Sequence, residues 1–108
     1  MPQIIVKGMK KEEIKEMSRT LTAGLAQIDG TPESYFTYEY IPAQFIQNGE
    51  EISLYPLVEV KMFDRGQDVK DRMAAAMTQA IREFGYEQIE IFFTFIGKPD
   101  YYENGEHY

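Results

Sequence analysis

Two stretches of this chain decide its fold: Pro2-Gln3-Ile4-Ile5-Val6-Lys7 and Pro56-Leu57-Val58-Glu59-Val60-Lys61. Each begins with a proline and runs through β-branched residues to a lysine, which is typical of a strand that starts at its proline. The two stretches align with one another at an offset of 54 residues. The segments that follow them can therefore be compared as two copies of one pattern.

A helix is predicted after each of these strands. Apolar residues recur there at spacings of three and four, the period of an amphipathic helix with one buried stripe. The first stripe holds Ile14, Met17, Leu21, Leu25 and Ile28, and the second holds Val69, Met73, Ala76, Met77, Ala80, Ile81 and Phe84. Gly30 and Gly85 follow the two stripes, where glycine commonly ends a helix.

A second strand and a tight hairpin are predicted after each helix. The aromatic and β-branched runs over residues 36–41 and 89–96 favour strands. Asn48-Gly49 and Asn104-Gly105 then predict hairpins, because this residue pair accepts the positive φ angles that a two-residue turn requires.

These matched elements predict an internal repeat. Phe45 stands three residues before one Asn-Gly-Glu as Tyr101 stands three before the other, at an offset of 56 residues, so about two inserted residues separate the copies. The chain is predicted to be a single domain, residues 1–108, built from repeats over residues 1–54 and 55–108.

The predicted fold class is α+β: tandem βαβ units related by a pseudo-two-fold, with a four-stranded mixed sheet, two helices on one face and short hairpins. A ferredoxin-like βαββαβ fold has the same element order and is the alternative. The strand over residues 89–96 is apolar on both faces, and Phe36, Tyr38 and Tyr40 add a row of rings. Two helices cover only one face, so the chain is predicted to self-associate.

Composition excludes several classes of function. The 108 residues include 11 Lys and Arg against 18 Asp and Glu, a net charge of −7, so no nucleic-acid partner is expected. Cysteine is absent and His107 is the single histidine, so no metal site and no cofactor are predicted. Apolar runs are short and no signal peptide is recognisable, so we expect a cytoplasmic protein with no membrane partner.

Pro2 is the candidate catalytic residue. Methionine is readily removed before a small residue such as proline, which would leave a secondary amine at the start of the chain. An α-amino group titrates near about 8, and burial beside cations lowers its pKa. A neutral amine at Pro2 could then move a proton at a carbon next to a carbonyl group. The alternative is that Pro2 only opens a strand.

Several motifs carry a resemblance to a known family. They are Tyr35-Phe36-Thr37 with Glu39-Tyr40, Tyr55-Pro56-Leu57-Val58-Glu59-Val60, Phe63-Asp64-Arg65-Gly66-Gln67 and Tyr101-Tyr102-Glu103-Asn104-Gly105-Glu106-His107. With the initial Met-Pro strand and the doubled βαβ unit, the chain resembles the tautomerase superfamily, which includes 4-oxalocrotonate tautomerase and macrophage migration inhibitory factor. The motifs themselves resemble an uncharacterised bacterial branch, domain-of-unknown-function family nineteen-zero-four.

The resemblance implies a tautomerase-like fold and a homotrimer. It also implies an isomerase that moves a proton on a small α-keto or enol carboxylic acid, with Pro2 as the general base. Small members of the superfamily bind the carboxylate with an arginine at the start of the first helix. The matching positions here are Lys10 and Lys11, and Arg65 is their counterpart in the second unit. Lysine forms a weaker bidentate contact than arginine does.

Other parts of the superfamily pattern are altered or open to a second interpretation. Some members use a lysine from the strand after the first helix, and residues 35–41 contain none. Arg65 stands beside Asp64, so an ion pair that fixes the loop is as good an interpretation as a substrate contact. Tyr101 and Tyr102 could close a neighbouring subunit's pocket or pack a hairpin onto the sheet. The second functional hypothesis is accordingly a non-catalytic trimeric module for binding or structure.

Overall fold

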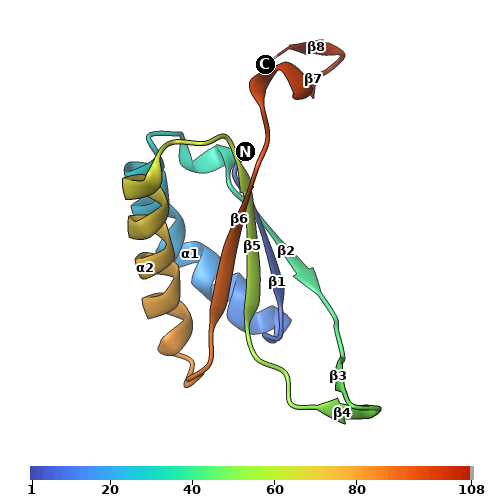
Figure 1. Cartoon of the computed structure of the whole chain (residues 1–108). Coiled ribbons are helices and arrows are strands. Elements are labelled where there is room, and N and C mark those ends of the chain that lie inside the picture. The colour runs from blue at the N-terminus through green and yellow to red at the C-terminus, as the bar shows by residue number, and fades with distance from the viewer. Residues whose placement is uncertain (108) are drawn as a thin grey trace.

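The structure is a computed structural model and describes residues 1–107. Its centre is a four-stranded sheet in the order β2-β1-β5-β6, with α1 and α2 packed together on one face (Figure 1). The strands and helices are β1 (Gln3–Lys7), α1 (Lys11–Asp29), β2 (Thr37–Ile41), β5 (Leu57–Met62), α2 (Gln67–Arg82) and β6 (Glu90–Phe95). The predicted α+β fold class is confirmed.

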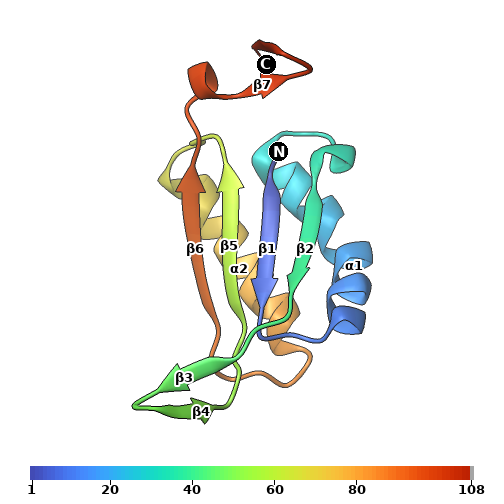
Figure 2. The same cartoon turned by 90° about the vertical axis from the view of Figure 1, so that its right-hand side faces the viewer.

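The sheet joins two βαβ units through their first strands. β1 pairs with β2 and β5 pairs with β6 in parallel, whereas β1 and β5 pair antiparallel with Val6 opposite Val58 and Gln3 opposite Lys61 (Figure 2). Each unit therefore keeps its two strands adjacent. A ferredoxin-like fold splits each βαβ unit by inserting a strand between its two strands, so that alternative is wrong.

The core lies between the helices and one face of the sheet. Alternate strand residues point toward the helices, as a strand's period of two requires. Those from the two central strands are Ile4, Val6, Val58, Val60 and Met62, and each is almost fully buried. Both helical stripes meet them as predicted: Ile14, Met17, Leu21 and Leu25 from α1, and Met73, Met77 and Ile81 from α2.

The opposite face of the sheet is more polar than its sequence pattern predicted. Tyr38 packs against the core on the α1 side, so the aromatic row does not lie on the open face. Ile5, Leu57 and Phe92 form an apolar strip there, and Lys7 and Glu59 border it. Charged residues interrupt this face, and the prediction of two largely apolar faces was wrong.

Both Asn-Gly pairs form the predicted turns. Asn48 and Asn104 have φ angles of 52° and 55°, and the glycines after them are also at positive φ. Such angles define the hairpin turn that matches strand twist. The hairpins are β3 (Phe45–Gln47) with β4 (Glu50–Ile52), and β7 (Tyr102–Glu103) with β8 (Glu106–His107). They project from opposite ends of the sheet (Figures 1 and 2). Short 3-10 turns, η1 (Glu33–Tyr35) and η2 (Lys98–Asp100), precede β2 and β7.

The antiparallel pairing of β1 and β5 gives the sheet two comparable ends. We call the end where β1 begins and β5 finishes the Pro2 end, and the opposite one the Pro56 end. The Thr37 N–H donates to the Pro2 carbonyl at 3.3 Å, and the Glu90 N–H donates to the Pro56 carbonyl at 3.0 Å. The backbone hydrogen bonding is thus the same at both ends.

Within residues 1–107, no helix is long and apolar enough to cross a membrane.

Candidate functional site

Pro2 is fully buried and lies directly before β1, one of the two inner strands of the central sheet. Gln3, the next residue, lies opposite Lys61, so the start of the chain lies beside the last residues of β5. The nitrogen of Pro2 is joined to Met1 in a peptide bond, and an amide nitrogen has no basic lone pair. Met1 is itself only half-buried.

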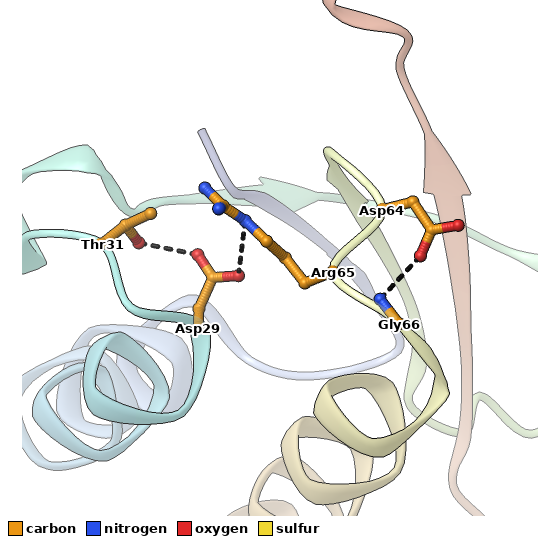
Figure 3. Close-up of polar contacts among 5 residues, drawn as sticks. All are labelled: Asp29, Thr31, Asp64, Arg65 and Gly66. Atoms are coloured by element: carbon orange, nitrogen blue, oxygen red, sulfur yellow. Dashed lines mark hydrogen bonds and ion pairs between the residues drawn. The ribbon is translucent and has the colours of Figure 1, made fainter.

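Arg65 lies at this same end, in the turn between β5 and α2. Asp64 shapes the turn by accepting a hydrogen bond from the Gly66 N–H at 2.8 Å, with Gly66 at a φ of 94°. The ion-pair partner of Arg65 is Asp29, whose Oδ1 lies 3.7 Å from Arg65 Nε (Figure 3). The sequence-based interpretation that Arg65 pairs with Asp64 was therefore wrong, because its partner is Asp29. Asp64 does fix the loop, but through the backbone.

Asp29 is a functional candidate that sequence reasoning missed. It is the last residue of α1, and its side chain is 2% exposed. Its Oδ2 accepts a hydrogen bond from Thr31 Oγ1 at 2.7 Å (Figure 3). The sequence did contain a signal, because a helix C-terminus carries partial negative charge and disfavours a carboxylate.

Lys10 and Lys11 lie at the Pro56 end, away from Pro2 and Arg65, and their side chains are exposed. Glu13 anchors the start of α1 there: its Oε1 accepts hydrogen bonds from the Lys10 N–H at 2.9 Å and from the Tyr86 hydroxyl at 2.6 Å. Burial and the Glu13 carboxylate raise the pKa of Tyr86 to about 12. The predicted cations are thus divided between the two ends of one chain.

Tyr101 and Tyr102 belong to the hairpin segment at the Pro2 end. The ring of Tyr101 meets Phe63 edge-on, with 5.4 Å between the ring centroids. Tyr102 is 59% exposed, and its ring lies 4.4 Å from that of His107. Only Tyr101 therefore packs toward the β5–α2 turn that carries Arg65.

A separate groove of about 350 Å³ runs between α1 and the edge strand β2. Its lining residues are Lys11, Ile14, Lys15, Ser18, Tyr38 and Tyr40. The Tyr38 hydroxyl is within 2.9 Å of Thr22 Oγ1, and burial raises the pKa of Tyr38 despite this hydrogen bond. The groove lies away from the turn that carries Arg65.

Among residues 1–107, no three His, Cys, Asp or Glu side chains are grouped closely enough to hold a metal ion.

Solved structures define the class of this fold. A fused 4-OT, described as a wild-type symmetric trimer, superimposes with a TM-score of 0.75 over 98% of this chain and 95% of that chain, at 21% identity. 4-OT is a tautomerase-superfamily protein, so the likeness shows that this chain has the tautomerase fold. At this level of identity the likeness shows the fold alone.

The family follows from closer similarities. The model of the family described as Domain of unknown function (DUF1904) matches residues 1–107, and the chain belongs to that family. The crystal structure of a DUF1904 domain from Sebaldella termitidis is 31% identical, with both chains fully covered and a TM-score of 0.94. A protein of unknown function from Vibrio cholerae is 27% identical over 99% of this chain and 87% of that chain, with a TM-score of 0.86. No curated protein matches the chain.

Proposed function

We propose that the chain, once it begins at Pro2, is an isomerase that moves a proton on a small α-keto or enol carboxylic acid. The Pro2 amine is the general base and Arg65 binds the substrate carboxylate. The tautomerase fold supports this proposal. The observation that carries it is the position of an arginine at the end of the sheet where the chain begins.

Removal of Met1 is the step that creates the base. It converts the amide nitrogen of Pro2 into a secondary amine and vacates the half-buried space that Met1 occupies. Burial and a cation at the same end both favour the neutral, basic form of an amine. The vacated space lies next to the nitrogen and so provides room for a small substrate.

The reaction needs no group that the chain lacks. The amine takes a proton from the carbon next to the keto group, and the electron pair moves onto the keto oxygen. The protonated amine then gives its proton to that oxygen, which releases the enol and restores the neutral amine. The reverse sequence returns the keto acid, so the isomerisation consumes no other reactant. Arg65 can offer its two terminal nitrogens to a carboxylate, a geometry that arginine supplies and lysine does not.

A homotrimer is the proposed assembly. Ile46 and Phe92 are 70% and 46% exposed, and within residues 1–107 the edge strands β2 and β6 have no partner on their outer sides. Exposed apolar groups and open edges favour self-association. Lys10 and Lys11 could join a Pro2 end only from a neighbouring subunit. Three chains of 12.6 kDa give about 38 kDa by light scattering, and a 12.6 kDa monomer at micromolar concentration would contradict the assembly.

The decisive experiment compares two preparations of the same chain. Enol–keto conversion of phenylpyruvate is measured for protein that begins at Pro2 and for protein that retains Met1, with both N-termini verified by intact mass. We expect the Pro2 preparation to be about 10²–10⁴-fold faster, the range that a positioned acid or base contributes. Pro2→Ala keeps a primary amine and should retain weak activity. Equal background rates in both preparations would leave the non-catalytic trimeric module as the function, a role that the burial of Pro2 in the Met1-containing chain favours.

A further inference from the structure

Asp29 is a charged residue whose position opposes stability in three ways. It is the buried charged residue among residues 1–107, and removing a carboxylate from water is costly. It occupies the last position of α1, where the helix dipole repels negative charge. Its Oδ1 is buried and accepts no hydrogen bond from residues 1–107. A group retained against these costs calls for an explanation.

The contacts of Asp29 orient its carboxylate toward a single group. Thr31 Oγ1 donates to Oδ2 at 2.7 Å, which fixes the plane of the carboxylate. Oδ1 then faces Arg65 Nε at 3.7 Å, an ion-pair distance that is too long for a hydrogen bond (Figure 3). The carboxylate therefore orients the guanidinium without saturating it.

Arg65 keeps its binding capacity in this arrangement. Its side chain is 37% exposed, and its contact with Asp29 is through Nε. Its two terminal nitrogens lie farther along the side chain than Nε, and no contact with Asp29, Thr31, Asp64 or Gly66 is drawn to them (Figure 3). If Arg65 only joined the two units, we would expect its two terminal nitrogens to contact Asp29 in a closer, bidentate arrangement.

We propose that Asp29 is a positioning residue that holds the Arg65 guanidinium so that its two terminal nitrogens receive a substrate carboxylate at the Pro2 end. Thr31 acts with it by fixing the Asp29 carboxylate. This inference rests on the proposed function for the identity of the ligand. Asp29 touches no reacting atom and acts through Arg65.

The test measures binding of phenylacetate, which carries a carboxylate but has no keto group to convert. Dissociation constants are measured by calorimetry for protein that begins at Pro2, and KM and kcat for phenylpyruvate are measured alongside. Arg65→Gln removes the guanidinium that binds the carboxylate and should abolish detectable binding. Arg65→Lys should weaken binding about tenfold, because a lysine cannot offer two parallel N–H groups to one carboxylate. Asp29→Asn keeps the shape but not the charge and should also weaken binding about tenfold, with a rise in KM larger than the fall in kcat.

Two further variants keep the test informative. Thr31→Val keeps the Asp29 charge and removes its orienting hydroxyl, so about threefold weaker binding is expected even if Asp29→Asn folds poorly. Arg72→Gln removes an arginine from an exposed ion pair with Asp68 and should bind phenylacetate as the unmodified chain does. Melting temperatures of all variants separate a loss of stability from a loss of binding.

The possible outcomes distinguish the two proposals. Wild-type affinity in Asp29→Asn, or a lower melting temperature with unchanged affinity, would overturn the positioning role. Failure of the unmodified chain to bind phenylacetate would overturn it as well. Arg65-dependent binding without any conversion of phenylpyruvate would overturn the proposed isomerase and leave the positioning role standing.

Discussion

The Pro2 end and the Pro56 end of the sheet share one backbone plan and differ in chemistry. At both ends a proline carbonyl accepts an N–H from the neighbouring parallel strand, Thr37 in one case and Glu90 in the other. Pro56 lies within the chain, so its nitrogen is always an amide. Pro2 follows Met1 directly, so removal of one residue turns its nitrogen into an amine. Under the proposed function, only the Pro2 end gains a base in this way.

The cations at the two ends of the sheet also differ, because among the residues that the structure describes only the one at the Pro2 end forms an ion pair with a buried carboxylate. Arg65 at the Pro2 end is tied to a buried carboxylate from the other βαβ unit. Lys10 and Lys11 at the Pro56 end are exposed and have no ion pair within residues 1–107. A repeated backbone fixes the packing at both ends but leaves each end free to carry different side chains. The buried charge of Asp29 is found at the end where we propose that the base forms.

The largest expected loss of stability is at the Pro56 end, where the β1–α1 turn presses against the segment that leads into β5. Gly8 has a φ of +85°, and a Cβ there would lie 1.9 Å from the Tyr55 carbonyl oxygen. Gly8→Ala should prevent folding or cost more than about 4 kcal/mol of unfolding free energy. Gly30→Ala is the control at the other end, because Gly30 has a φ of +78° but open space around it, and it should cost about 1–2 kcal/mol. Similar midpoints of chemical denaturation for the two variants would contradict the close approach.

Large and nearly equal losses of unfolding free energy are expected in the two helices, because both bury an apolar stripe against the sheet. Leu21 in α1 and Met77 in α2 are 8% and 1% exposed. Leu21→Ala and Met77→Ala should each lower the unfolding free energy by about 2–5 kcal/mol, because each leaves a cavity. Lys15→Ala on an exposed face should change it by less than about 0.5 kcal/mol. Urea denaturation that found all three variants alike would contradict the helix registers.

A smaller difference in unfolding free energy is expected between two ion pairs that have the same nitrogen–oxygen distance but differ in burial. Arg65–Asp29 and Arg72–Asp68 both have a nitrogen–oxygen distance of 3.7 Å, but the Asp29 side chain is 2% exposed and that of Asp68 is 85% exposed. Arg65→Ala should cost about 1–3 kcal/mol, since it leaves a buried carboxylate without its cation. Arg72→Ala should cost less than about 0.5 kcal/mol. Equal costs in thermal or chemical denaturation would mean that Asp29 is hydrated.

The smallest expected effect concerns the contact between Tyr86 and Glu13 at the Pro56 end. Tyr86→Phe should cost about 1 kcal/mol at neutral pH through the lost hydrogen bond. The pKa of Tyr86 is raised to about 12 in the folded chain from an ordinary value of 10, so the folded chain holds this proton more tightly. The stabilisation is complete below pH 10 and is lost as the pH rises toward 12. The gap between the unmodified chain and Tyr86→Phe should therefore close over that range, and a constant gap would contradict the raised pKa. Tyr102→Phe, whose ring is mostly exposed, is the control.

The elements of the fold could be predicted because their signals are local. The stripes through Leu21 and Met77 and the two Asn-Gly turns each lie within a short segment. The separation of Lys10 from Pro2 was also contained in the sequence, because a strand of five residues holds its ends about 17 Å apart. The pair between Asp29 and Arg65 was not, since it depends on β5 running antiparallel to β1. The adjacent Asp64 was the nearer candidate partner along the chain.

The β3–β4 hairpin makes a two-stranded sheet separate from the central one and carries Ile46, which is 70% exposed. An isolated two-stranded ribbon is marginally stable, so its backbone hydrogen bonds open locally at little cost in free energy. In a lone chain the amide protons of Gln47 and Glu50 should exchange with solvent deuterium almost as fast as in a peptide. Amides of β1 in the same chain should exchange only through global unfolding. Packing of a second subunit over the hairpin would slow its exchange, which makes these few amides a residue-level reporter of assembly.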